Sequence, residues 1–128
     1  MARTLRLGLA QINPTVGDLS GNMEKILEFA AEAERRGVDL LAFPELVITG
    51  YPPEDLLLKP GFIQDNLKAL KEVVAYTEGK EITLIVGFVN MEEDLYNAAA
   101  IVHGGEVRGI YHKTYLPNYG VFDEERYF

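Results

Sequence analysis

The fold is decided by Val38-Asp39-Leu40-Leu41-Ala42-Phe43, a short apolar run of the kind found in strands buried within parallel sheets. Upstream of this run, residues 5–12 alternate apolar side chains with polar or small ones, which predicts a first strand. Downstream of it, residues 82–88 form another apolar run. A helical pattern separates each predicted strand from the next, and such crossovers place successive strands in one sheet. The sequence therefore predicts an α/β fold.

The first predicted helix carries its apolar residues at spacings of three and four, at Met23, Ile26, Leu27, Ala30 and Ala33. Asp18 or Ser20 can cap its start, and Arg35-Arg36-Gly37 supplies a basic last turn and a glycine stop. The second predicted helix spans residues 62–77. Both helices have one apolar face, so both are expected to pack against the sheet.

The remaining segments are predicted from turn chemistry and alternation. A proline-rich loop occupies residues 44–60, and a hairpin of residues 95–102 and 107–111 turns at Gly104-Gly105. No further element is expected beyond Lys113. Residues 82–88 are apolar on both faces, so we expect helices to cover one face and another layer to cover the second.

The composition excludes several classes of function. With a net charge of −8, the chain lacks the basic surface that nucleic acids or anionic membranes require. No apolar run approaches the roughly 20 residues of a membrane span, and the N-terminus lacks the apolar core of a signal peptide. The absence of cysteine excludes disulfides and thiolate metal sites. We expect a cytoplasmic protein that binds neither nucleic acid nor a membrane.

Two charged residues stand where open α/β sheets place their sites, at the carboxyl ends of strands. Glu45 follows residues 38–43, and Lys113 follows the last predicted strand, so we expect neighbouring strands whose two side chains converge on one cleft. A carboxylate among apolar neighbours must be paired or have a raised pKa, and either state suits a general base. A nearby lysine can stabilise an oxyanion. Spacing alone does not separate this interpretation from a buried structural ion pair.

The sequence around these two residues resembles the carbon–nitrogen hydrolases, the nitrilase superfamily. The glutamate motif is matched by Phe43-Pro44-Glu45-Leu46-Val47-Ile48-Thr49-Gly50-Tyr51, and the lysine motif by His112-Lys113-Thr114-Tyr115-Leu116-Pro117. Two further stretches resemble the glutaminase domains of glutamine-dependent NAD synthetases, Tyr51-Pro52-Pro53-Glu54-Asp55-Leu56 and Asn118-Tyr119-Gly120-Val121-Phe122-Asp123-Glu124. The resemblance covers essentially the whole chain, in order.

This resemblance implies that residues 1–128 form the first half of a nitrilase-type α-β-β-α sandwich, with a mixed sheet and two flanking helices. It implies that a cysteine attacks the glutamine side-chain amide, with Glu45 as the base and Lys113 stabilising the tetrahedral species. Tyr119 matches a position that contacts glutamine, and Glu124 and Tyr51 are weaker candidates for lining the pocket. No cofactor is implied for the glutaminase half. The released ammonia would serve a C-terminal synthetase domain that uses ATP and magnesium, in a protein expected to be a homo-oligomer.

The sequence departs from the family pattern in one respect. The cysteine nucleophile belongs after the lysine motif, and this chain has no cysteine. Ser20, at a predicted helix start, is the only serine, and it is a poor replacement. We therefore expect residues 1–128 to be a partial glutaminase domain, truncated before the catalytic cysteine and inactive alone.

Two other functions remain open from the sequence. One is a stand-alone amidase of the superfamily that acts on a small ω-amide or carbamoyl compound. The other is a non-catalytic, glutaminase-like interaction module, with which the missing cysteine is compatible. No metal site is expected, because His103 and His112 have no partner at metal-ligand spacing.

Overall fold

A computed structural model describes residues 3–119 and 122–128, and its centre is a five-stranded mixed sheet in the order β1-β2-β3-β4-β5. Strands β1 (Leu7–Leu9), β2 (Leu40–Ala42) and β3 (Thr83–Met91) run parallel. Strands β4 (Leu95–His103) and β5 (Glu106–His112) continue the sheet as an antiparallel meander. The predicted order of elements and the predicted hairpin are confirmed.

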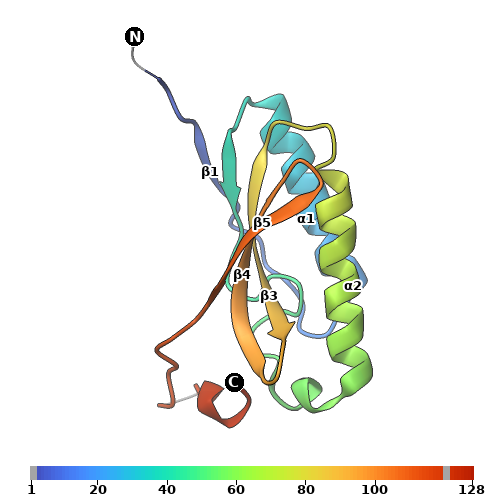
Figure 1. Ribbon diagram of the computed structural model, residues 1–128, viewed down its shortest axis with the longest axis vertical. Coiled ribbons are helices and arrows are strands. Elements are labelled where there is room, and N and C mark those ends of the chain that lie inside the picture. Colours follow the sequence, from blue (N-terminus) through green and yellow to red (C-terminus); the bar gives the residue numbers. More distant parts are fainter. Residues whose placement is uncertain (1–2, 120–121) are drawn as a thin grey trace.

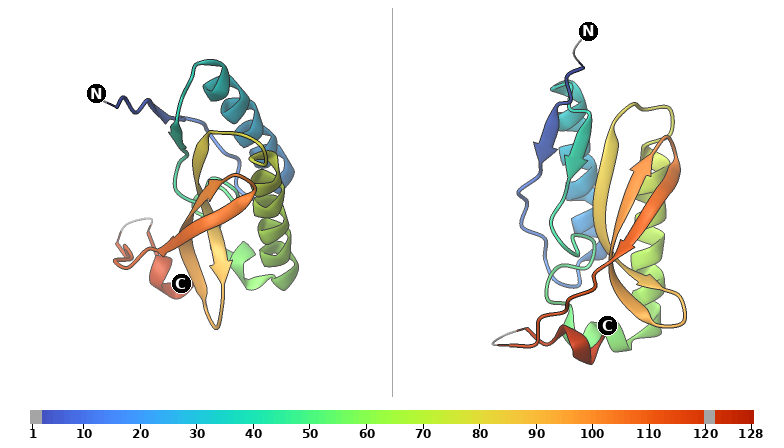
Figure 2. Two further views of the ribbon diagram at one scale, coloured as in Figure 1. Left: turned by 45° about the horizontal axis from the view of Figure 1, so that its top comes forward. Right: turned by 60° about the vertical axis from the view of Figure 1, so that its left-hand side comes forward.

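Helices α1 (Leu19–Arg35) and α2 (Pro60–Tyr76) lie on the same face of the sheet (Figure 1, Figure 2). Asp18 caps α1 by accepting a hydrogen bond from the backbone N–H of Gly21. Between the helices and the sheet lies the larger of two apolar clusters, to which Ile26, Val73 and the β3 side chains Leu84, Val86 and Phe88 contribute. A second, smaller cluster of Leu46, Leu57, Ile63 and Val89 lies where the turn after β2 meets the segment that leads into α2.

Four details differ from the sequence prediction. Strands β1 and β2 are shorter than expected, and β2 starts late because the backbone N–H of Val38 completes the end of α1 by bonding to the carbonyl oxygen of Ala33. Strand β3 is longer, since its pairing with β4 extends to Met91. The proline-rich loop contains a 3₁₀ helix, η1 (Glu54–Leu58). The expectation of no element beyond Lys113 was wrong, because a second 3₁₀ helix, η2 (Glu124–Arg126), forms there around the buried Glu124 side chain.

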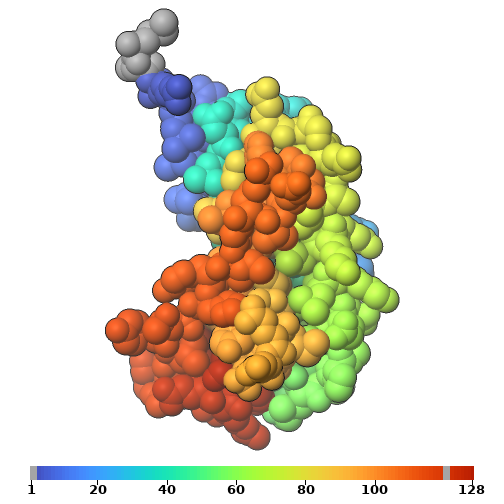
Figure 3. All heavy atoms as spheres, in the orientation of Figure 1, coloured from blue at the N-terminus to red at the C-terminus, as the bar shows by residue number. Residues whose placement is uncertain are grey.

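The face of the sheet away from the helices has no covering layer among the described residues. It exposes apolar side chains of strands β1, β4 and β5, and these include Leu7, Leu9, Ile101 and Tyr111. We call this surface the open face. In the space-filling view the molecule is hollowed on this side, between β1 and the C-terminal segment (Figure 3). Within the described chain, neither helix is long and apolar enough to cross a bilayer.

Candidate functional site

Lys113 lies between two carboxylates at the end of β5. Its Nζ donates hydrogen bonds to Glu45 Oε1 at 2.7 Å and to Glu124 Oε1 at 3.0 Å. The hydroxyl of Tyr51 donates to the same oxygen of Glu124 at 2.7 Å. The expected convergence of Glu45 and Lys113 is therefore present, and Glu124 and Tyr51 join it directly.

Tyr119 is more remote from this cluster. Its side chain is 69% exposed, and its ring meets Phe122 edge-on with centroids 5.5 Å apart. Phe122 in turn lies 6.2 Å from the ring of Tyr51. The structure thus connects Tyr119 to the cluster through aromatic packing and gives it no direct contact with Glu45 or Lys113.

The two strands that carry Glu45 and Lys113 are not neighbours, contrary to expectation, because β3 and β4 lie between β2 and β5. Glu45 spans this gap because the turn after β2 crosses directly over Gly87 of β3. A Cβ at Gly87 would lie 2.4 Å from the backbone nitrogen of Leu46 and 2.9 Å from the carbonyl oxygen of Pro44. Only a residue without a side chain allows two backbones to approach this closely.

The turn also leaves Glu45 partly exposed and, of the two states expected for its carboxylate, the structure shows the paired one. Leu46, Val47 and Ile48 are fully buried, whereas the Glu45 side chain is 45% exposed. Leu46 adopts a positive φ of 48°, which helps to separate the direction of Glu45 from that of its apolar neighbours. Glu45 is therefore paired rather than desolvated.

Sequence reasoning missed Asn97, a residue of β4 that is 4% exposed. Its Nδ2 donates to Glu45 Oε1 at 2.6 Å, and its carbonyl oxygen accepts the backbone N–H of Lys113 at 2.8 Å. The available signal was its position, because an asparagine directly before a run of alanines in a strand is a buried polar group that needs a partner.

The charges of the cluster reinforce one another. Partial burial acts to lower the pKa of the Lys113 ammonium, but the hydrogen bonds to Glu45 and Glu124 outweigh it and raise that pKa. Burial and the hydrogen bond to Glu124 raise the pKa of the Tyr51 hydroxyl well above its ordinary value. At neutral pH Lys113 is thus a cation, and Tyr51 is a hydrogen-bond donor.

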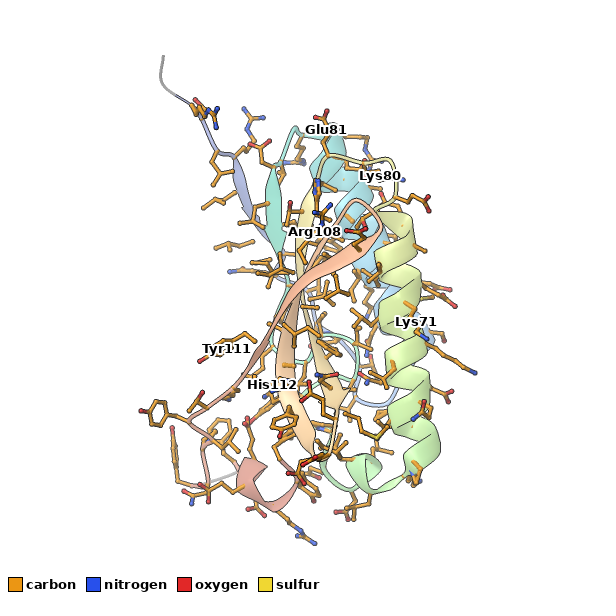
Figure 4. The ribbon with its side chains drawn as sticks, in the orientation of Figure 1. Lys71, Lys80, Glu81, Arg108, Tyr111 and His112 are labelled. Atoms are coloured by element: carbon orange, nitrogen blue, oxygen red, sulfur yellow. The ribbon has the colours of Figure 1, made fainter. Side chains whose placement is uncertain are left out.

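Two smaller hollows flank the ion pairs, next to a larger one of about 500 Å³ that Asn97 and Lys113 also line. One, of about 240 Å³, opens on the open face and is lined by Glu45, Asn97 and Lys113 together with apolar groups that include Phe43, Ile85 and Tyr111. The Tyr111 side chain extends away from the helices (Figure 4). The other, of about 210 Å³, lies beside η1 and η2 and is lined by Tyr51 and Glu124 among others. The 5%-exposed Glu124 therefore lines the second hollow and bonds to Lys113, which lines the first.

Neither histidine belongs to this cluster. His112 stacks on Tyr96 with ring centroids 4.0 Å apart and pairs with Asn90 at 3.0 Å. His103 contacts Thr83 at 3.1 Å. Among the residues that the structure describes, no three His, Asp or Glu side chains are grouped as a metal site would require.

Comparison with known proteins finds a matching family and similar relatives. The carbon–nitrogen hydrolase profile matches residues 6–128. The chain is 52% identical over 126 residues to the glutamine-dependent NAD(+) synthetase of Thermotoga maritima, covering 98% of this chain and 22% of that protein. The chain therefore spans about a fifth of the length of such relatives.

Solved structures of related proteins also resemble this chain. The glutamine-dependent NAD+ synthetase of Acinetobacter baumannii, in complex with ADP, is 43% identical with a TM-score of 0.86, over 97% of this chain and 23% of that one. An amidase from Nesterenkonia sp. is 27% identical with a TM-score of 0.85, over 97% of this chain and 47% of that one. The five-stranded mixed sheet with its two helices thus matches part of nitrilase-superfamily structures.

Proposed function

Because this chain belongs to the carbon–nitrogen hydrolase family, we propose that residues 1–128 form the N-terminal part of a glutaminase domain that hydrolyses the side-chain amide of glutamine. The observation that carries this proposal is Lys113 held between Glu45 and Glu124 at the rim of a hollow. A cation fixed by carboxylates, beside a partly exposed base, suits chemistry at an uncharged amide carbonyl.

In the proposed reaction the nucleophile is a cysteine outside residues 1–128. Its thiol proton passes to Glu45 as sulfur bonds to the amide carbon, and the Lys113 ammonium stabilises the resulting oxyanion. Glu45 then returns the proton to the amide nitrogen, the carbon–nitrogen bond breaks, and ammonia leaves a thioester. Glu45 next takes a proton from water, the hydroxide displaces sulfur, and the thiolate regains that proton as glutamate leaves.

The other residues support this chemistry in the proposal. Glu124, on the far side of Lys113 from Glu45, keeps the ammonium charged and fixed. Tyr51 holds Glu124 in turn. Tyr119 contacts the glutamine substrate, and its 69% exposure leaves its ring free for that contact. Tyr51 and Glu124 also line the neighbouring hollow and there complete the substrate pocket.

We further propose that the ammonia serves an NAD synthetase domain that follows in the same polypeptide. The support is the identity to glutamine-dependent NAD(+) synthetases and the 22% of their length that this chain spans. That domain would use ATP and magnesium, and the glutaminase half would use no cofactor. The A. baumannii relative was solved with ADP, which is in line with a nucleotide site in such a domain. We expect the complete protein to be cytoplasmic and homo-oligomeric.

The test is ammonia release from glutamine by the complete polypeptide that carries these residues. Glu45→Gln should lower kcat by about a hundredfold or more, because the carboxamide cannot take a proton. The matched control is Glu93→Gln, the same exchange in the exposed β3–β4 turn. Undiminished turnover in Glu45→Gln, or no turnover in the unaltered protein, would remove the proposal.

A second candidate is an amidase that acts on a small amide without a synthetase partner. The observation that favours it is the fold match to the Nesterenkonia amidase, at 27% identity and a TM-score of 0.85. The same assay with butyramide in place of glutamine distinguishes the two. A preference for butyramide would support the amidase.

A further inference from the structure

Asn97 contacts both charged partners of the candidate site through different atoms. Its side-chain Nδ2 donates to Glu45 Oε1 at 2.6 Å, and its backbone oxygen accepts from the Lys113 N–H at 2.8 Å. At 4% exposure, it is fixed within β4, the strand that lies between β3 and β5. One buried residue thus sets the position of the carboxylate relative to the backbone of the lysine.

The two oxygens of Glu45 are in different states. Oε1 accepts from both Asn97 Nδ2 and Lys113 Nζ, at 2.6 and 2.7 Å. Oε2 has no hydrogen-bond partner among the residues that the structure describes, and the side chain is 45% exposed. An oxygen that already accepts two hydrogen bonds, one from a cation, is the weaker proton acceptor of the pair.

We propose that Asn97 is a positioning residue that anchors Glu45 through Oε1, so that Oε2 is the oxygen that takes and returns the proton. This inference rests on the proposed amide hydrolysis. Lys113 alone would not fix the carboxylate, because a flexible ammonium attracts either oxygen, whereas the planar amide of Asn97 is held by its strand. Asn97 therefore makes the two oxygens of Glu45 inequivalent.

The charged and titratable groups near Glu45 determine how a substitution of Asn97 changes the pH dependence of the rate. Lys113 contacts it from the end of β5, Glu124 faces Lys113 from η2, and Tyr51 lies within the same hydrogen-bonded chain. Asn97→Asp adds a carboxylate against Glu45 Oε1, and two carboxylates in contact resist ionising together. The acid limb of the rate profile should then move to higher pH.

The experiment compares three variants of the complete polypeptide, assayed by ammonia release from glutamine between about pH 5 and 9. Asn97→Ala should lower kcat by up to about a hundredfold while KM changes little, because Glu45 is displaced rather than removed. Asn97→Asp should lower kcat and shift the acid limb upward by about one pH unit or more. Asn90→Ala is the matched control: Asn90 is also a buried asparagine, on the adjoining strand β3, but it bonds His112 and has no contact with Glu45.

The outcomes separate the two proposals. An unaltered protein that releases no ammonia from glutamine removes the proposed function itself. An active unaltered protein whose Asn97→Ala variant keeps its kcat, or whose Asn97→Asp variant keeps its acid limb, removes only the role of Asn97. Equal losses in Asn97→Ala and Asn90→Ala, with no pH shift in Asn97→Asp, would assign Asn97 to sheet stability and overturn the inference.

Discussion

Gly87→Ala should disrupt the candidate site by displacing the turn that carries Glu45. The new Cβ would lie 2.4 Å from the backbone nitrogen of Leu46, whereas ordinary contact begins at 3.4 Å, so the turn that carries Glu45 must move by about 3.4 − 2.4 = 1.0 Å. Neither neighbour is a flexible side-chain end, since both Leu46 N and Pro44 O are backbone atoms. We expect a cost of about 1–3 kcal/mol in unfolding free energy, as for other overpacked sites. A shift of about 1 Å at Glu45 should also lower kcat by roughly a hundredfold.

The measurement is thermal unfolding and ammonia release by the complete polypeptide. Gly109→Ala is the control: it makes the same substitution in β5, where a Cβ would meet only the side-chain end of Ile101 at 3.8 Å. That variant should keep both stability and activity. If Gly87→Ala behaved like Gly109→Ala in both assays, the crossing of the turn over Gly87 would not be what places Glu45.

Three other measurements test the missing thiol, the open face and the pairing of Tyr76. The purified 128-residue chain should release no ammonia from glutamine, because thiolate chemistry needs a thiol; turnover above that of its Lys113→Ala variant would contradict this. The same isolated chain should self-associate or bind a hydrophobic dye through the open face, and sedimentation of a compact monomer that unfolds cooperatively and binds no dye would count against it. Burial and a hydrogen bond to Glu34 raise the pKa of Tyr76 to about 12, above its ordinary 10. The protonated Tyr76 hydroxyl therefore stabilises the fold fully below pH 10, and this contribution is lost as the pH rises toward 12. Tyr76→Phe should flatten that part of a curve of stability against pH, measured by denaturant titration.

The order of elements was predictable because each is set by local pattern. The apolar spacing of α1 and the continuous apolar runs of β2 and β3 depend only on near neighbours in sequence. Boundaries were less predictable, as Val38 illustrates. Its side chain fits a strand, but its backbone N–H is used by the end of α1, which no propensity reveals.

The sequence predicted the two charged residues of the candidate site but not how they meet. Glu45 and Lys113 were found from their places at strand ends and from the motifs around them. Their meeting across two intervening strands was not predictable, because it depends on the turn after β2 crossing over Gly87 of β3. A glycine inside an apolar strand does signal a close approach of another backbone, but it does not say which one. Asn97 was missed because a single asparagine in a strand has many possible partners, and only the three-dimensional register selects Glu45.

The contacts of the C-terminal segment join residues that are made at very different times. Glu45 precedes Lys113 by 68 positions, and Tyr51 precedes Glu124 by 73. At elongation rates of about 5–20 residues per second, Glu45 emerges from the ribosome roughly 3–14 seconds before its lysine. The α1, β2 and Glu45 segment can collapse within that interval, since helices and short loops form in microseconds. During biosynthesis Glu45 therefore has neither of its carboxylate partners until β4 and the end of β5 have been made, and the charged cluster is complete only when Glu124 follows, 11 positions after Lys113.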